Sequence, residues 1–187
     1  MTQSLKGKRV AFLVTDGFER VELTAPREAL EQAGARTLIA AARPGKVIAW
    51  NHTTPADRLH VDRTFDTLQI DDCDALVLPG GVVNADNIRL DEMAQELVRD
   101  AARANKPIAA ICHGSWLLIS ADLVKGKTLT SWPSLRDDLQ NAGATWIDRP
   151  VVVDGQLITS RKPADIPAFS QALIDMLGGK AEHVSAA

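Results

Sequence analysis

Three short apolar runs of this chain end in the same way, and this repeated ending is what most constrains the fold. The runs cover residues 10–14, 74–78 and 107–111. They lead directly into Asp16-Gly17, Gly80-Gly81 and Cys112-His113, with a helix-compatible stretch further on in each case. Strands that are apolar throughout are typical of parallel sheets with helices on both faces. The sequence therefore predicts a flavodoxin-like, doubly wound α/β fold in which the three turns meet at one edge of the sheet.

The remaining segments fit a single domain built on this plan. We expect a helix over about residues 22–33, started late or kinked by Pro26, and strands at residues 37–41 and 127–130. Residues 43–70 have the character of a small hairpin excursion, and Asp154-Gly155 sits between two strand-like runs. A chain of 187 residues can bury a full core. We predict one domain over residues 1–187, with a frayed tail at about 181–187.

Composition and charge exclude several classes of function. A net charge of −3 predicts no nucleic-acid partner, and no apolar run is long enough to predict a membrane span. Two cysteines, Cys73 and Cys112, without a C-x-x-C or a metal-ligand spacing fit a reducing cytoplasm and predict no metal site. The absence of a P-loop or a G-x-G-x-x-G motif speaks against a nucleotide, and we expect no cofactor.

Cys112 is the candidate nucleophile because of its predicted position between a buried strand and a helix. The unpaired N–H groups and partial positive charge of a helix N-terminus favour a thiolate, so we expect a depressed pKa for this thiol. Gly114 lets the backbone approach closely after the turn. The alternative is a packing residue, since free cysteines are among the most buried residue types. Cys73, between Asp72 and Asp74, is expected to be inert.

The familiar layouts of nucleophilic enzymes do not fit this turn. A G-x-S-x-G type elbow requires glycine where Ala110 stands, and an amidotransferase requires a later histidine followed by an acid, whereas His183 has none after it. The general base that remains is His113. Its partner group would come from another part of the chain or from another subunit. His52 and His60 lie in the excursion and are expected at the surface rather than as metal ligands.

Several motifs in order along the chain resemble the PfpI (intracellular protease I) family, in the superfamily of the parkinsonism-associated protein deglycase, which also includes general stress proteins. These motifs read D-G-F-E-R-V-E-L, L-V-L-P-G-G, A-I-C-H-G, T-S-W-P-S-L-R-D-D-L-Q-N-A-G-A and V-V-V-D-G-Q-L-I-T-S-R-K-P-A-D. They span nearly the whole chain. The resemblance implies a flavodoxin-like fold with the nucleophile on a strained elbow.

The resemblance also implies roles for particular residues. Cys112 would be the nucleophile, Glu22 the acid that hydrogen-bonds its sulfur, and His113 the catalytic histidine. Asp86 matches the carboxylate that a neighbouring subunit donates to that histidine, so the active unit would be a homo-oligomer, a dimer or larger. The amides of Gly81 and His113 would form the oxyanion-binding pair.

Each assignment has a structural alternative. Glu22 could complement the helix dipole, and Asp86 could cap the helix that follows it. Ser115-Trp116 replaces the proline-containing continuation of several family members, which leaves the substrate preference open. Trp116 and Trp132 are more often core or interface aromatics than groups that stack on a ligand.

Three functions remain open from the sequence. The first is a stress-protective, thiol-dependent enzyme for reactive carbonyls, acting on methylglyoxal like a glyoxalase III or on early glycation adducts like a deglycase. The second is an intracellular cysteine peptidase with a peptide substrate. The third is a non-catalytic stress protein, either chaperone-like or with Cys112 as a peroxide sensor. The family resemblance favours the first.

Overall fold

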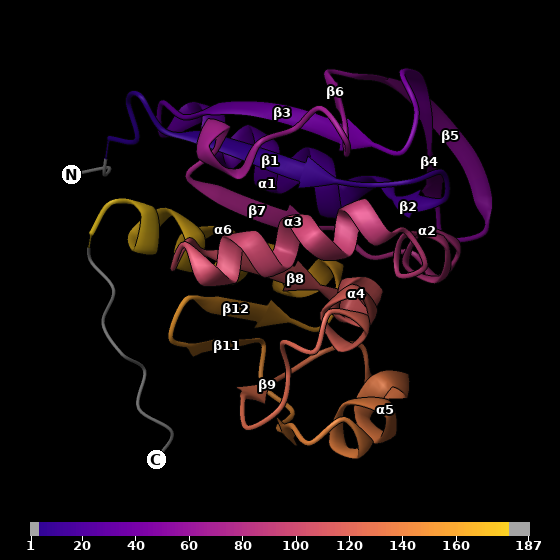
Figure 1. Ribbon diagram of the computed structural model, residues 1–187, viewed down its shortest axis with the longest axis vertical. Coiled ribbons are helices and arrows are strands. Elements are labelled where there is room, and N and C mark those ends of the chain that lie inside the picture. The colour runs from indigo at the N-terminus through magenta and orange to yellow at the C-terminus, as the bar shows by residue number, and fades with distance from the viewer. Residues whose placement is uncertain (1–3, 180–187) are drawn as a thin grey trace.

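Residues 4–179 of the chain are described by a computed structural model, and they form one α/β domain around a seven-stranded sheet. The strands lie in the order β11-β12-β8-β7-β1-β3-β6 (Figure 1). All neighbours pair in parallel except β11 and β12, which form an antiparallel hairpin at one edge. The predicted doubly wound, mostly parallel fold is therefore confirmed. The predicted tail at 181–187 lies outside the described residues.

The strands of the main sheet are short, and the central strands β7 and β8 are apolar throughout. Their bounds are Arg9–Leu13 (β1), Arg36–Ala41 (β3), Arg63–Thr64 (β6), Ala75–Leu78 (β7), Ile108–Ile111 (β8), Val151–Asp154 (β11) and Leu157–Ser160 (β12). Two smaller sheets stand beside it. One joins Phe18–Glu19 (β2), Gly45–Asn51 (β4) and Thr54–Val61 (β5), and the other joins Thr128–Leu129 (β9) and Thr145–Trp146 (β10).

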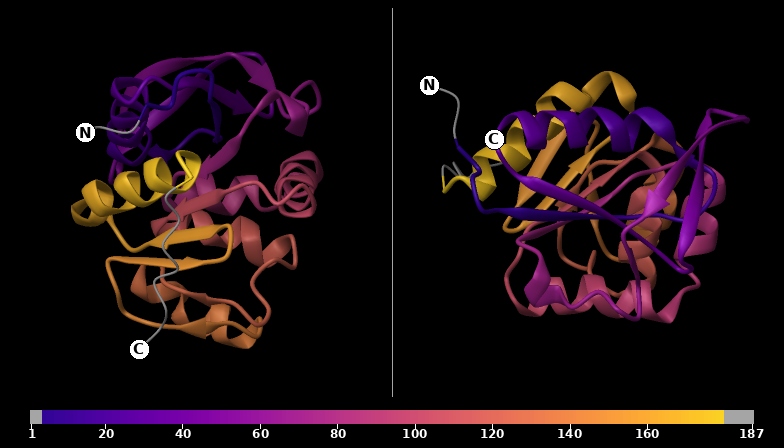
Figure 2. Two further views of the ribbon diagram at one scale, coloured as in Figure 1. Left: turned by 90° about the vertical axis from the view of Figure 1, so that its left-hand side faces the viewer. Right: turned by 90° about the horizontal axis from the view of Figure 1, so that it is seen from above.

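Helices cover both faces of the sheet, as the view from above shows (Figure 2). Arg20–Gln32 (α1) and Ile166–Leu177 (α6) pack on one face, and Glu92–Arg103 (α3) packs on the other. The shorter helices are Val82–Ile88 (α2), Ser115–Ser120 (α4) and Arg136–Asn141 (α5). None of the helices within residues 4–179 is both long and apolar enough to cross a bilayer.

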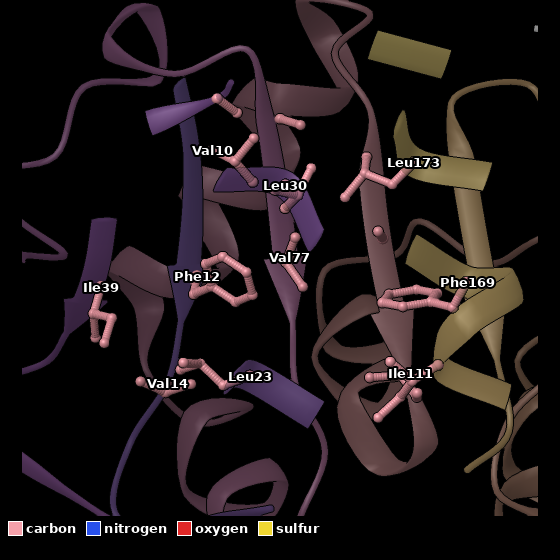
Figure 3. Close-up of a cluster of buried hydrophobic side chains, with 14 of the residues drawn as sticks. Val10, Phe12, Val14, Leu23, Leu30, Ile39, Val77, Ile111, Phe169 and Leu173 are labelled. Carbon is pink, nitrogen blue, oxygen red and sulfur yellow. The ribbon is translucent and has the colours of Figure 1, made fainter. Parts of the chain in front are cut away.

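The alternation of side chains along β1 shows how the core is divided. Val10 and Phe12 face the helices α1 and α6, and Figure 3 shows them among side chains from both helices and from β7 and β8. Ala11 and Leu13 belong to the cluster on the opposite face, under α3. All four side chains are fully buried, because a central parallel strand loses both faces to covering helices.

Two helix boundaries differ from the prediction. Helix α1 begins at Arg20, earlier than expected, and carries Pro26 in its interior. A separate short helix, α2, precedes α3, and the N-cap of α3 is Asp91, whose side chain accepts the Ala94 N–H at 3.0 Å. Asp86 lies inside α2, so the interpretation of Asp86 as the cap of the following helix is wrong.

The tight packing around Phe12 leads to a stability prediction. Phe12→Ala should lower the free energy of unfolding by about 3–5 kcal/mol, because it removes a fully buried ring and leaves a cavity between the sheet and α1. Urea unfolding followed by circular dichroism measures this loss. Met93→Ala removes a side chain that is 48% exposed and should cost less than about 1 kcal/mol. Equal losses in the two variants would contradict this account of the core.

Candidate active site

The turn after β8 places Cys112 at the carboxyl edge of the sheet in a strained backbone conformation. Its φ is +60°, in the left-handed region that non-glycine residues rarely adopt. Gly114, two residues later, has no space for a side chain: an added Cβ would lie 2.3 Å from the carbonyl oxygen of Leu78. The turn is therefore pressed against the end of the neighbouring strand β7, and this contact fixes the direction of the thiol.

Glu22 of α1 approaches the same turn from the other side. The carboxyl is fully buried, and its Oε2 accepts the Gly80 N–H at 2.7 Å. A Cβ on Gly80 would lie 2.6 Å from this oxygen and 2.7 Å from Cβ of Cys112, so Glu22 and Cys112 flank the glycine. The other carboxyl oxygen, Oε1, is buried without a hydrogen-bond partner. The structure thus brings the predicted acid and nucleophile together.

Burial determines the protonation state of Glu22. The pKa of this carboxyl is raised to about 8: loss of solvent is the largest cause, the Gly80 N–H and Cys112 act against it, and the nearby Glu19 carboxylate adds a smaller increase. At neutral pH the carboxyl keeps its proton. A protonated Glu22 is a hydrogen-bond donor, which is the state that a thiolate or an oxyanion beside it requires.

The expectation of a depressed pKa for Cys112 is wrong for this structure. Burial, followed by the Glu22 carboxylate, raises the pKa of the Cys112 thiol, while the backbone N–H groups of His113 and Gly81 lower it. The sequence argument considered only the effect of the helix N-terminus on the thiol and not its burial. Helix α4 has only six residues, so its dipole stabilises a thiolate weakly. Cys73 is buried as well, and desolvation raises its pKa to about 11, in agreement with its predicted inertness.

His113 lies beside the thiol within an aromatic enclosure. Its Nδ1 is 3.2 Å from Sγ of Cys112, and burial lowers the pKa of the imidazole, so the ring is neutral at pH 7. Trp132 stacks on the ring at 6.0 Å between centroids, and Trp116 meets it edge-on at 5.4 Å. A neutral imidazole with a free ring nitrogen at this distance can take the proton of the thiol.

Trp116 is itself held in place from two directions. The guanidinium of Arg89 lies 5.3 Å above its ring, and its indole N–H donates to Asp138 at 2.9 Å. The residue that departs from the family pattern thus supports the histidine rather than lining the pocket.

Asp86 does not meet His113 within this chain. It lies on the exposed side of α2, and no hydrogen bond or ion pair within residues 4–179 joins it to the imidazole. The proposed donation from a neighbouring subunit stays a prediction.

A cavity of about 320 Å³ opens above the thiol. Four of the predicted site residues line it, namely Glu22, Gly81, Cys112 and His113. Six further lining residues were not assigned to the site from the sequence: Glu19, His52, Thr53, Val82, Trp132 and Pro163. The sequence favours a core or interface position for Trp132, but the structure places it on the pocket wall. His52 was expected only as a surface residue, and its side chain is 86% exposed, but the β4–β5 hairpin carries it to the pocket.

One sequence signal could have indicated part of this set. Glu19 precedes Glu22 by three residues, a spacing that places two side chains on one face of a helix. Nothing local marks His52 or Thr53, because the hairpin that carries them reaches the pocket only through the pairing of β4 with β2.

The raised pKa of Glu22 predicts a dependence of stability on pH. The folded protein keeps a proton that the unfolded chain releases between about pH 4.5 and 8, so the free energy of unfolding falls as the pH rises through this window, by up to about 5 kcal/mol. Glu22→Gln keeps an acceptor for the Gly80 N–H but does not titrate. Its advantage over the wild type should therefore grow from pH 5 to pH 8.

Urea unfolding at three pH values tests this expectation. Glu28→Gln, at an exposed position of the same helix, is the matched control and should keep the slope of the wild type. Parallel curves for Glu22→Gln and the wild type would show that Glu22 titrates normally in the folded protein.

Known proteins share this sequence and architecture. Residues 8–176 match the DJ-1/PfpI family. The chain is 43% identical to deglycase PfpI of Pyrococcus furiosus over 169 residues, which cover 90% of this chain and 99% of that protein. It is 38% identical to protein/nucleic acid deglycase 2 of Escherichia coli over 172 residues, 91% of this chain and 98% of the relative.

A solved structure agrees with the sequence relatives. Drosophila melanogaster DJ-1beta superposes with a TM-score of 0.84 at 28% identity, over 92% of this chain and 91% of that one. The resemblance inferred from the motifs is confirmed. The chain belongs to the DJ-1/PfpI family.

Proposed function

We propose that the protein is a stress-protective, cysteine-dependent enzyme that acts on reactive α-oxoaldehydes such as methylglyoxal, free or as early glycation adducts. The observation that carries this proposal is the thiol of Cys112, 3.2 Å from a neutral imidazole and beside a buried, protonated carboxyl. The names of the relatives support it, since two of them are deglycases. A cavity of about 320 Å³ holds a small carbonyl compound with ease.

The first step needs no preformed thiolate. With Nδ1 unprotonated, His113 takes the thiol proton as Cys112 sulfur forms a bond to the aldehyde carbon, and the proton passes to the aldehyde oxygen. The product is a hemithioacetal. The N–H groups of Gly81 and His113 and the proton of Glu22 are the donors available to the developing charge.

The second step is an internal oxidation and reduction. His113 moves the proton from the former aldehyde carbon to the ketone carbon through an enediol, which oxidises the first carbon to a thioester and reduces the second to an alcohol. Water then cleaves the thioester and gives lactate and the free thiol. With an adduct on an amine, the sulfur displaces the amine, and the remaining steps are the same.

Two further parts of the proposal rest on separate observations. We place the enzyme in the cytoplasm, because both cysteines are free thiols and the chemistry requires a reduced one. We assign small carbonyls or glycated protein as substrates and not nucleic acid, because the net charge is −3, although the name of the Escherichia coli relative includes nucleic acid.

A direct comparison of substrates tests the reaction class. Wild-type enzyme should convert methylglyoxal to lactate, and Cys112→Ser should be slower by at least about 100-fold, because the hydroxyl is a far weaker nucleophile. Cys73→Ser is the matched control and should keep the activity. Casein should stay intact, since the cavity leaves little room for a chain. Casein cleavage without lactate formation would favour the peptidase, and neither activity would favour the peroxide sensor.

The assembly is the second part to be tested. Val82, Val83 and Leu90 of the α2 region are 54%, 40% and 76% exposed, an apolar surface beside the site that a second copy of the chain can cover. Asp86 lies on the same helix. In such an oligomer Asp86 of one subunit would supply the carboxylate that His113 lacks within its own chain.

Mixing two inactive variants measures this contribution. Asp86→Ala should lower the activity without unfolding the protein, and mixing it with Cys112→Ser should restore part of it, since each subunit supplies what the other lacks. Native mass spectrometry confirms that mixed oligomers form. Mixed oligomers without recovery would show that Asp86 acts within its own chain or has no catalytic role.

A further inference from the structure

The charges that line the cavity are unevenly distributed. Its ionisable residues are Glu19, Glu22, His52, Cys112 and His113, and no lysine or arginine is among the described lining residues. At neutral pH Glu22 keeps its proton, the Cys112 thiol keeps its own, and His113 is neutral. Glu19 is then the remaining acidic side chain among the described lining residues, and His52 is the remaining basic one.

The fold holds Glu19 at this position by its backbone and its side chain. It is the last residue of β2 and the N-cap residue of α1, and its own N–H donates to the Gly80 carbonyl at 3.2 Å. Its Oε2 accepts the His52 N–H at 2.9 Å, with the His52 ring nitrogen Nδ1 3.7 Å away. The side chain is 12% exposed. It is fixed at the mouth of the pocket rather than free in solvent.

No strong cation neutralises this carboxylate among residues 4–179. The adjacent Arg20 pairs instead with Asp57 of β5 at 2.5 Å. The imidazole of His52 is the one basic group within 4 Å, and it is largely exposed. The field of Glu19 reaches the reacting groups, because it contributes to the raised pKa of Glu22.

We propose that Glu19 determines the charge specificity of the site: it admits neutral carbonyl compounds and disfavours molecules that carry a carboxylate or phosphate. This inference rests on the proposed function for its substrate class. It also assigns a role in product release, because methylglyoxal enters neutral and lactate leaves as an anion. Two like charges several ångströms apart in a half-buried pocket repel by an amount that corresponds to a change on the order of tenfold in binding.

A pair of nearly isosteric alkylating reagents tests the inference without any turnover. Iodoacetamide is neutral and iodoacetate is anionic, and both alkylate a thiol. The rate of each reaction at Cys112 is measured by mass spectrometry at pH 7 in a Cys73→Ser background. The thiolate fraction cancels in the ratio of the two rates, and dividing this ratio by that for 2-mercaptoethanol, a thiol without another charged group, removes the intrinsic reactivities of the reagents.

For the wild type, the ratio of the iodoacetamide rate to the iodoacetate rate should be about tenfold higher than the same ratio for the reference thiol. Glu19→Gln, which keeps an acceptor for the His52 N–H, should bring the ratio down to about that of the reference. Glu28→Gln removes an equal charge from the exposed face of the same helix and should leave the preference of the wild type intact. The same comparison in a Glu22→Gln background removes any change in Glu22 ionisation caused by the loss of Glu19.

Salt provides a second measurement that needs no variant at position 19. Raising NaCl from 0.05 to 1 M should move the preference of the wild type part of the way toward the reference value, because dissolved ions screen the approach of an anion to a charge at the mouth of an open pocket. An unchanged ratio in Glu19→Gln, or equal changes in Glu19→Gln and Glu28→Gln, would overturn the inference. Since alkylation requires only the thiol, this outcome is independent of whether methylglyoxal is a substrate.

Discussion

The site depends on two places where the backbone leaves no room for a side chain. Strands β7 and β8 are parallel neighbours, and the turn after β8 packs so closely on the end of β7 that Gly114 and Gly80 admit no Cβ. Glu22 then reaches the Gly80 N–H from α1. The candidate nucleophile, the buried carboxyl and the amides around them are thus brought together by sheet geometry, and the backbone strain lies at Cys112, whose φ is positive.

This close approach makes Glu22 and Cys112 a coupled pair. Glu22 raises the pKa of Cys112, Cys112 lowers the pKa of Glu22, and burial raises both pKa values. The two groups therefore titrate as a pair rather than independently. The raised pKa of the thiol is compatible with the proposed reaction, because Nδ1 of a neutral His113 lies 3.2 Å from the sulfur and could take its proton. A thiol that stays protonated at rest is also less exposed to oxidation between turnovers.

The sequence predicted the strands of the central sheet and the residues at the centre of the site. The apolar runs predicted the strands, and the turns after β1, β7 and β8 predicted the edge at which Cys112 and His113 lie, whereas the place of Glu22 came from the family resemblance. The direction of the pKa shift of the Cys112 thiol could not be predicted from the sequence, because desolvation depends on how completely the folded chain covers the side chain. The place of Glu19 and His52 in the pocket could not be predicted for a similar reason. The hairpin that carries His52 is distant in sequence, and it reaches Glu19 through the pairing of β4 with β2 and the hydrogen bond from the His52 N–H.

The burial of the Glu22 carboxyl lowers the stability of the folded protein. A carboxyl with one oxygen lacking a hydrogen-bond partner costs free energy in the core. In return, the carboxyl keeps a proton beside the sulfur at neutral pH, whereas a solvent-exposed carboxyl would lose it. Glu19, at the mouth, adds to the same effect, because its charge helps keep that proton in place. The environments of the two carboxyls therefore fit them to different roles: the buried Glu22 keeps its proton and can donate a hydrogen bond, whereas Glu19 lies at the mouth of the pocket, where ligands enter and leave.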